Sequence, residues 1–234
     1  MRQMKLSFAA IASVLVSGTA SFAADMPMNL PPPPVVTAPV ETLSGWYVRG
    51  DIGYRFQDTG SVTSAIAPNP TNNRIDDAFA IGVGVGYKWS WFRTDITADY
   101  GFSSKYSGDT AGFTPDFTAK VQTTTVLANG YFDLGTWYGF TPYVGAGVGG
   151  AYVQTSDFLS ASAPAAAVSS DRWNFAWAAM AGVSYCFTPN LILDIGYRYL
   201  DQGQVKTGLT SLGDQLTFKD LTAQEIRAGF RWAM

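Results

Sequence analysis

Few side chains in this sequence could carry out catalysis. The 234 residues include no histidine and a single cysteine, Cys186. Without histidine, the chain cannot form a Ser-His or Cys-His catalytic pair or an imidazole metal site. One cysteine can form neither an internal disulfide nor a thiolate metal site. The sequence therefore predicts a protein that is not an enzyme and that uses no cofactor or metal.

Two remaining patterns resemble known motifs. Gly145 to Gly150 read G-x-G-x-x-G, which binds dinucleotides when it lies between a strand and a helix. These glycines recur every second residue, however, and no helical pattern follows. Asp95 and Asp99 could form a glycosidase carboxylate pair, but they alternate along one segment with Arg93. We interpret both patterns as packing inside a β-structure, where glycines leave room for large side chains and acids pair with bases.

The elements that carry these residues are predicted to be β-strands. From 46 to 56, most even positions are apolar, and the odd positions include Arg49 and Asp51. A period of two is typical of a strand with one apolar and one polar face. In one segment the register is ambiguous, because Val126 and Leu127 compete for the apolar face. The alternation predicts eight strands, at about 46–56, 79–89, 92–102, 123–132, 142–152, 173–187, 191–199 and 226–232.

The connections between these strands alternate in length. The short ones are expected at 90–91, 134–139 and 188–190. The long ones, rich in small polar residues, Gly and Pro, are expected at about 57–76, 103–119, 154–170 and 201–219. Only an up-and-down antiparallel order places all long connections at one end and all short turns at the other.

Charge is confined to one face of the expected strands. Charged residues make up 14% of the chain, against about 25% in an ordinary soluble domain. A membrane barrel turns its apolar face to lipid and fills its interior with polar side chains, whereas a soluble barrel does the reverse. Five acids and seven bases share the charged face, and we predict that they form an ion network in the lumen: Arg49, Asp51, Arg55, Lys88, Arg93, Asp95, Asp99, Asp194, Arg198, Glu225, Arg227 and Arg231.

Aromatic residues fall near both ends of the strands on the apolar face. Two such belts match the two interfaces of a membrane. The belt at the short-turn end is predicted to contain Trp46, Trp89, Phe92, Phe140, Phe187 and Trp232. The belt at the long-connection end is predicted to contain Phe56, Phe79, Phe102, Tyr152, Trp173 and Tyr199. The predicted fold is therefore all-β, an eight-stranded antiparallel up-and-down transmembrane β-barrel with a polar interior.

The residues before the barrel have a different composition. Residues 1–23 combine a positive start, a short apolar run and small residues suited to cleavage, which predicts a secretory signal peptide. Residues 24–44 contain four consecutive prolines and are predicted to form an extended periplasmic linker. The barrel is expected over 45–234. The formal net charge of −3 gives no basic footprint for nucleic acid.

Three segments of the barrel resemble those of a known family. Gly45–Gly50, Thr141–Gly149 and Gly196–Tyr199 read GWYVRG, TPYVGAGVG and GYRY. With the export signal and eight strands, they resemble small outer-membrane β-barrel proteins, in particular porin-family surface antigens of alpha-proteobacteria with an OmpA-like β-barrel domain. The resemblance implies location in the cell outer membrane. It also implies contact with outer-membrane lipids and lipopolysaccharide, with the barrel-assembly machinery, and through the loops with host or envelope partners.

Four functions follow as hypotheses. The first is a non-enzymatic outer-membrane protein with a structural and surface-interaction role carried by four long extracellular loops. The second is a passive porin for small solutes. The third, a membrane-embedded enzyme, is disfavoured because comparable barrel enzymes use histidine. The fourth is a haem-binding surface receptor, which the resemblance suggests for some branches. Its axial ligand would have to be Tyr or Met, and the loop residues Tyr106 and Tyr152 are available, although neither lies in a motif.

Overall fold

The computed structural model describes most of the chain after the predicted linker. The predicted signal peptide, 1–23, and all of the predicted linker except Ser44 lie outside the described residues. Within the described part, no helix is long and apolar enough to cross a membrane. The described residues are 44–58, 61–64, 71–110, 113–160, 170–203, 205–206, 216–219 and 221–234.

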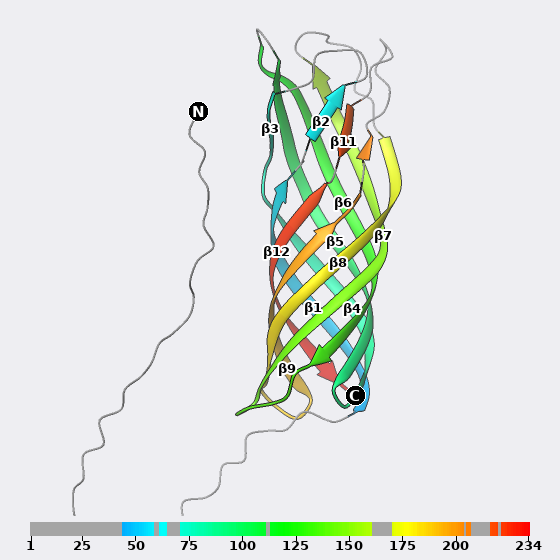
Figure 1. Ribbon diagram of the computed structural model, residues 1–234, viewed down its shortest axis with the longest axis vertical. Coiled ribbons are helices and arrows are strands. Elements are labelled where there is room, and N and C mark those ends of the chain that lie inside the picture. Colours follow the sequence, from blue (N-terminus) through cyan, green and yellow to red (C-terminus); the bar gives the residue numbers. More distant parts are fainter. Residues whose placement is uncertain are drawn as a thin grey trace, which may run out of the picture. The chain divides into compact units, whose positions relative to one another are not determined.

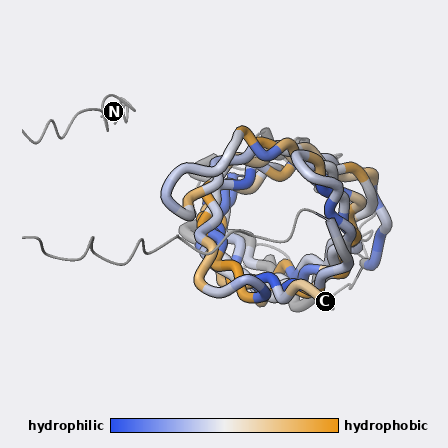
Figure 2. Tube along the Cα trace, turned by 90° about the horizontal axis from the view of Figure 1, so that it is seen from below, coloured by the Kyte–Doolittle hydropathy of each residue, from blue (hydrophilic) through white to orange (hydrophobic). Residues whose placement is uncertain are grey.

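Eight antiparallel strands close into a barrel, which confirms the predicted fold class (Figure 1). Each strand pairs with the next, and β12 pairs back with β1, so that the strands form a closed ring when seen along the barrel (Figure 2). All three predicted short turns are present. The strands are β1 (Ser44–Asp58), β4 (Ala78–Trp89), β5 (Phe92–Thr110), β6 (Phe113–Asp133), β7 (Phe140–Ser160), β8 (Ser170–Cys186), β9 (Leu191–Asp201) and β12 (Thr222–Ala233).

The pairing of β1 with β4 shows how lumen-facing glycines make room for long side chains. The register runs from Ser44 opposite Trp89 to Arg55 opposite Ala78 without a shift, so Asp51 lies opposite Gly82. A Cβ atom on Gly82 would lie only 2.6 Å from the guanidinium of Arg227. This glycine therefore supplies the space that a long lumen side chain occupies, as the sequence pattern predicts.

The seam between the first and last strands closes at the short-turn end. The backbone N–H of Met234 donates to the carbonyl of Trp46 at 2.9 Å, and that of Ala233 donates to the carbonyl of Asn190 at 2.8 Å. The chain terminus is therefore part of the barrel wall.

The interior is polar over part of its length and apolar beyond it. Leu127 is fully buried inside the barrel, whereas Val126 is 40% exposed on the outer face, which resolves the ambiguous register of β6. Along most strands, the apolar inward residues lie closer to the long-connection end than the charged ones. This apolar layer consists of Ile75, Tyr106, Val121, Leu127, Ala151, Val153, Ala176, Ala178, Leu200, Leu221 and Ala223.

Strands extend into two of the predicted long connections. The expected connection at 103–119 is wrong: β5 continues to Thr110 and β6 begins at Phe113. Likewise, β7 continues into the expected connection at 154–170, as far as Ser160. The physical reason is that the outer face beyond the membrane no longer has to be apolar. On the extension of β5, Ser103 and Lys105 are exposed whereas Tyr106 is buried inside, so the pattern of apolar outward and polar inward residues is lost.

The other two long connections carry short strands. In the first, β3 (Thr71–Ile75) pairs with the extension of β5. The first connection also contains β2 (Ser61–Ser64), and the last contains β10 (Val205–Lys206) and β11 (Leu216–Lys219). Strand β11 pairs with β10 on one side and with β2 on the other. The first and last long connections therefore meet in a three-stranded sheet at the long-connection end.

Candidate functional site

The twelve charged residues predicted for the lumen all lie on the inner face of the barrel. Eleven of them are buried. The remaining one, Arg49, keeps 12% of its side chain exposed. Burial of so many charges is tolerated only where they pair with one another and satisfy their hydrogen bonds, so the pairing decides what this lumen can do.

Glu225 on β12 holds one end of the network. Its side chain is fully buried. Arg55 Nε lies 2.6 Å from Oε1, Arg198 Nη2 lies 2.7 Å from Oε2 and Arg227 Nη1 lies 3.0 Å from Oε2. One carboxylate therefore joins three guanidinium groups, from strands β1, β9 and β12.

Asp99 on β5 connects two of these arginines from the opposite wall. Arg198 Nη1 lies 2.7 Å from Oδ2, and Arg227 Nη2 lies 2.5 Å from Oδ1. Arg227 also pairs with Asp51, which in turn lies 3.2 Å from Arg49. These contacts tie β1, β5, β9 and β12 together across the lumen.

Asp95 continues the chain of contacts toward the short-turn end. It accepts hydrogen bonds from Arg49 Nη1 at 3.1 Å, Asn129 Nδ2 at 2.7 Å and the Tyr47 hydroxyl at 3.0 Å. The Tyr131 hydroxyl accepts from the same Arg49 nitrogen at 2.9 Å. Neutral polar groups thus satisfy the parts of the carboxylate that no arginine reaches.

Two further carboxylates lie near the short-turn end. Asp194 pairs with Arg231 at 2.7 Å. Asp133 pairs with Arg93 at 2.9 Å and with Lys88 at 3.2 Å. Every acid predicted for the network therefore has at least one basic partner, and none is placed as a free general acid or base.

Several lumen residues were missing from the sequence-based set. Asp133 was not included, although its odd position on β6 matches Asn129 and Tyr131. Tyr131 and Tyr143 stack on Arg93, whose guanidinium lies 5.0 Å and 4.8 Å from their ring centroids. The signal that could have found them is position parity, which places a residue inside whether it is charged or not.

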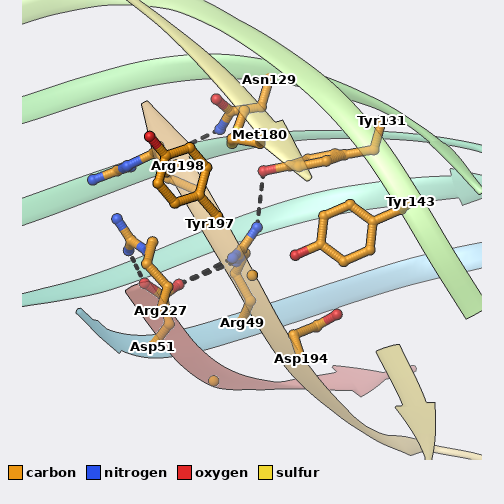
Figure 3. Close-up of a pocket in the computed structure, with 13 residues that line it drawn as sticks. Arg49, Asp51, Asn129, Tyr131, Tyr143, Met180, Asp194, Tyr197, Arg198 and Arg227 are labelled. Atoms are coloured by element: carbon orange, nitrogen blue, oxygen red, sulfur yellow. Dashed lines mark hydrogen bonds and ion pairs between the residues drawn. The ribbon is translucent and has the colours of Figure 1, made fainter. Parts of the chain in front are cut away.

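A small polar cavity lies within this network (Figure 3). The volume open to the centre of a water-sized sphere is about 30 Å³, enough for about two water molecules. Its lining includes Arg49, Asp51, Asn129, Tyr143, Asp194 and Arg227. Among the described residues, no group of three or more His, Cys, Asp or Glu side chains is placed to hold a metal ion. The cavity can hold water, and its charged lining is occupied by internal ion pairs.

The twelve predicted interface aromatics lie on the barrel exterior, and none is buried. Trp46 and Trp173 are 59% and 65% exposed. Additional aromatics extend the short-turn group: Trp91 stacks on Phe132 with ring centroids 5.5 Å apart. Aromatics thus gather on the outer face near both ends of the strands.

The two tyrosines considered as haem ligands do not lie in loops, which corrects that expectation. Tyr106 lies on the extension of β5 and is fully buried, and burial raises the pKa of its phenol. A higher pKa disfavours the tyrosinate form. Tyr152 lies on β7 and donates a hydrogen bond to Asp171 at 3.0 Å. The geometry therefore gives no support to either residue as a haem ligand.

Comparison with known proteins gives related sequences and a matching fold. An uncharacterized protein of Brucella suis is 36% identical over 226 residues, which cover 81% of this chain and 78% of the relative. A protein of Rickettsia felis named as a putative adhesin is 25% identical, with 86% of this chain and 85% of the relative covered. The outer membrane protein OprG of Pseudomonas aeruginosa has a TM-score of 0.55 and 17% identity, covering 83% of this chain and 98% of OprG.

The family assignment rests on almost the whole sequence. The match to the family described as "Outer membrane protein beta-barrel domain" covers residues 10–233. It agrees with the closed barrel, the apolar exterior and the charged interior. The chain therefore belongs to the outer membrane protein β-barrel domain family and is an integral protein of the outer membrane.

Proposed function

We propose that this protein is a non-enzymatic surface protein, in which a sealed barrel anchors an interaction surface built at the long-connection end. The observation that carries the proposal is the contrast between the two regions. The lumen is filled by internal ion pairs and an apolar layer. The long-connection end, by contrast, is built up by the extensions of β5, β6 and β7 and by the sheet of β2, β10 and β11.

In this arrangement the long connections lie outside the cell. Strand β1 begins and strand β12 ends at the short-turn end of the barrel. The predicted linker, which precedes β1, would therefore emerge on the periplasmic side. The Rickettsia relative is named as a putative adhesin, which agrees with a contact role for the exposed end. The partner would be a host or envelope surface.

Attachment of bacteria to cultured host cells tests this proposal. The protein would be displayed in a Gram-negative strain that does not attach by itself. Residues 65–70, 161–167 and 207–215 would be replaced in turn by short Gly-Ser linkers. We expect attachment to fall to the background level in at least one replacement. Equal attachment in all three replacements and the parent would contradict the proposal.

Deletion of residues 161–167 should leave insertion and heat resistance of the barrel unchanged. This segment lies outside the described residues, and its Ala-rich sequence offers no core contribution. Exposed connections generally tolerate such deletions. Migration of unheated and heated samples on a gel measures the folded fraction, and loss of the folded band in the variant would show that the segment is needed for the barrel.

The alternative of a passive porin predicts steady conductance, and we expect none. Eight strands leave an interior only wide enough for side chains to fill, and here the long side chains of Arg55, Arg198 and Arg227 are held across the lumen by Glu225 and Asp99. Single-channel recording in a planar bilayer should show no openings, or rare and small ones. A trimeric porin in the same bilayer is the positive control. Steady openings of porin size would favour the second hypothesis over ours.

A further inference from the structure

We propose that the tip of the turn between β6 and β7, formed by Trp137 and Tyr138, binds the sugar rings of the cell-wall glycan. This turn lies at the short-turn end of the barrel, opposite to the surface proposed above for attachment. The lumen network does not include the two residues, and neither do the two predicted aromatic belts. The inference rests on the orientation proposed above, in which the short-turn end faces the periplasm.

The tip of the turn is a two-residue hairpin. The backbone N–H of Trp137 donates to the carbonyl of Phe140 at 2.8 Å, and that of Phe140 donates to the carbonyl of Trp137 at 2.9 Å. The two residues between them, Tyr138 and Gly139, have positive φ values of 52° and 84°. A two-residue hairpin with two positive φ values is a type I′ turn, which prefers Asn-Gly, Asp-Gly or Gly-Gly at its centre. A tyrosine is therefore unusual at position 138.

The backbone of Tyr138 is unfavourable for a large side chain. A bulky residue rarely adopts a positive φ, because its Cβ atom approaches the following carbonyl oxygen. In the turn between β4 and β5, the residue with a positive φ is the small Ser90. Strained backbone positions often coincide with functional sites. The stability of the turn thus does not explain why position 138 is a tyrosine.

The side chain of Tyr138 gains no packing in return for this strain. It is 92% exposed, more than any other large apolar or aromatic side chain among the described residues. Its neighbour Trp137 is also exposed, at 57%. Tyrosine and tryptophan offer a large, rigid contact area and are frequent in binding interfaces. We therefore interpret the tip as a contact surface.

The composition of the turn indicates the chemistry of the partner. Residues 134–142 contain no charged side chain. The nearest charged residue along the chain, Asp133, pairs with Lys88 and Arg93 on the inner face of the barrel. A contact with lipid phosphates or with an acidic partner would be expected to use Lys or Arg at this level. A neutral partner therefore matches the tip better than a charged one.

A neutral sugar ring has the matching surface. The flat faces of a pyranose ring carry C–H groups, and their partly positive hydrogens are attracted to the negative face of an aromatic ring. Such a contact requires no charge on either side. On the periplasmic side of an outer membrane, the cell wall consists of strands of N-acetylated amino sugars. These glycan strands are the partner that we assign to the tip.

Sedimentation with insoluble cell-wall glycan tests this proposal. Refolded full-length protein in detergent would be mixed with glycan that has been freed of protein and of its peptide stems. The variant Tyr138→Asn removes the ring and supplies the residue that a type I′ turn prefers. The matched control Tyr138→Phe keeps the ring. Soluble oligomers of N-acetylglucosamine would serve as competitors.

We expect Tyr138→Asn to bind the glycan about fivefold or more weakly than the parent, and Tyr138→Phe to bind like the parent. The oligomers should displace the parent from the glycan. Equal binding of the parent and Tyr138→Asn would overturn the proposal, as would a failure of the oligomers to compete.

Two further measurements separate glycan binding from other roles of Tyr138. In denaturant titration, Tyr138→Asn should be at least as stable as the parent, because asparagine suits the turn; a marked loss of stability would show a structural role instead. Retained phosphatidylethanolamine would be counted by native mass spectrometry. Fewer retained lipids in Tyr138→Asn, with unchanged glycan binding, would show a lipid contact and overturn the proposal. No cell is present, so the outcome is separate from that of the attachment experiment.

Discussion

The substitution Glu225→Gln should lower the free energy of unfolding by about 3–5 kcal/mol, since it removes one partner from buried ion pairs. The amide keeps the size of the side chain but not its charge. Arg55, Arg198 and Arg227 all lie within 3.0 Å of this carboxylate. Asp99 also pairs with Arg198 and Arg227. Denaturant titration in lipid vesicles measures the loss.

The substitution Asp171→Asn is the matched control for Glu225→Gln. Asp171 also changes from carboxylate to amide, but it is exposed and accepts one hydrogen bond, from Tyr152. Loss of this carboxylate should lower the free energy of unfolding by at most about 1 kcal/mol. An equal loss of stability in the two variants would mean that the ion pairs of Glu225 with the buried arginines do not stabilise the barrel.

The substitution Val83→Arg should lower the free energy of unfolding by about 2–4 kcal/mol, because it places a charge toward lipid in the middle of a strand. Val83 is 65% exposed on the outer face of β4. Its cross-strand neighbours are Gly50 and Ala98, so no acid on these strands faces the new guanidinium. The same titration in lipid vesicles measures the change.

The substitution Val83→Ala separates the effect of charge from the loss of the valine side chain. It should cost no more than about 1 kcal/mol, because the alanine remains apolar and creates no internal cavity. The adjacent lumen residue Gly84 is not a suitable comparison, since a Cβ atom there would lie 2.9 Å from the carbonyl oxygen of Ile96. Similar losses for arginine and alanine at position 83 would mean that this face does not meet lipid.

The sequence predicted the faces of the strands well because alternation is a local property. The twelve charged residues lie inside, and the short turns at 90–91, 134–139 and 188–190 are present. The strand extensions at 103–119 escaped prediction, since their exposed residues, such as Ser103 and Lys105, are polar while Tyr106 is buried inside. Leu127 shows a second limit: an apolar layer inside the barrel reverses the rule that inward means polar.

The partners within the lumen could not be predicted from alternation. Arg227 on β12 meets Asp99 on β5, which lies 128 residues away in the sequence. The odd or even position of a residue along its strand predicts that both residues face inward. Their relative height, however, depends on how the strands are staggered around the barrel. The residues of the network were therefore predictable, while its connections were not.

The seam between β1 and β12 has a consequence for how the protein matures. The strands that close the ring are the first and the last of the barrel, and they pair at twelve positions from Tyr47 with Ala233 to Asp58 with Thr222. Such distant contacts form slowly, and this one cannot form before β12 has been synthesised. A chain cut short before β12 would leave β1 and β9 with unpaired edges, which are templates for aggregation. Closure of the seam is thus a checkpoint in maturation, at which only chains that contain β12 become stable in the membrane.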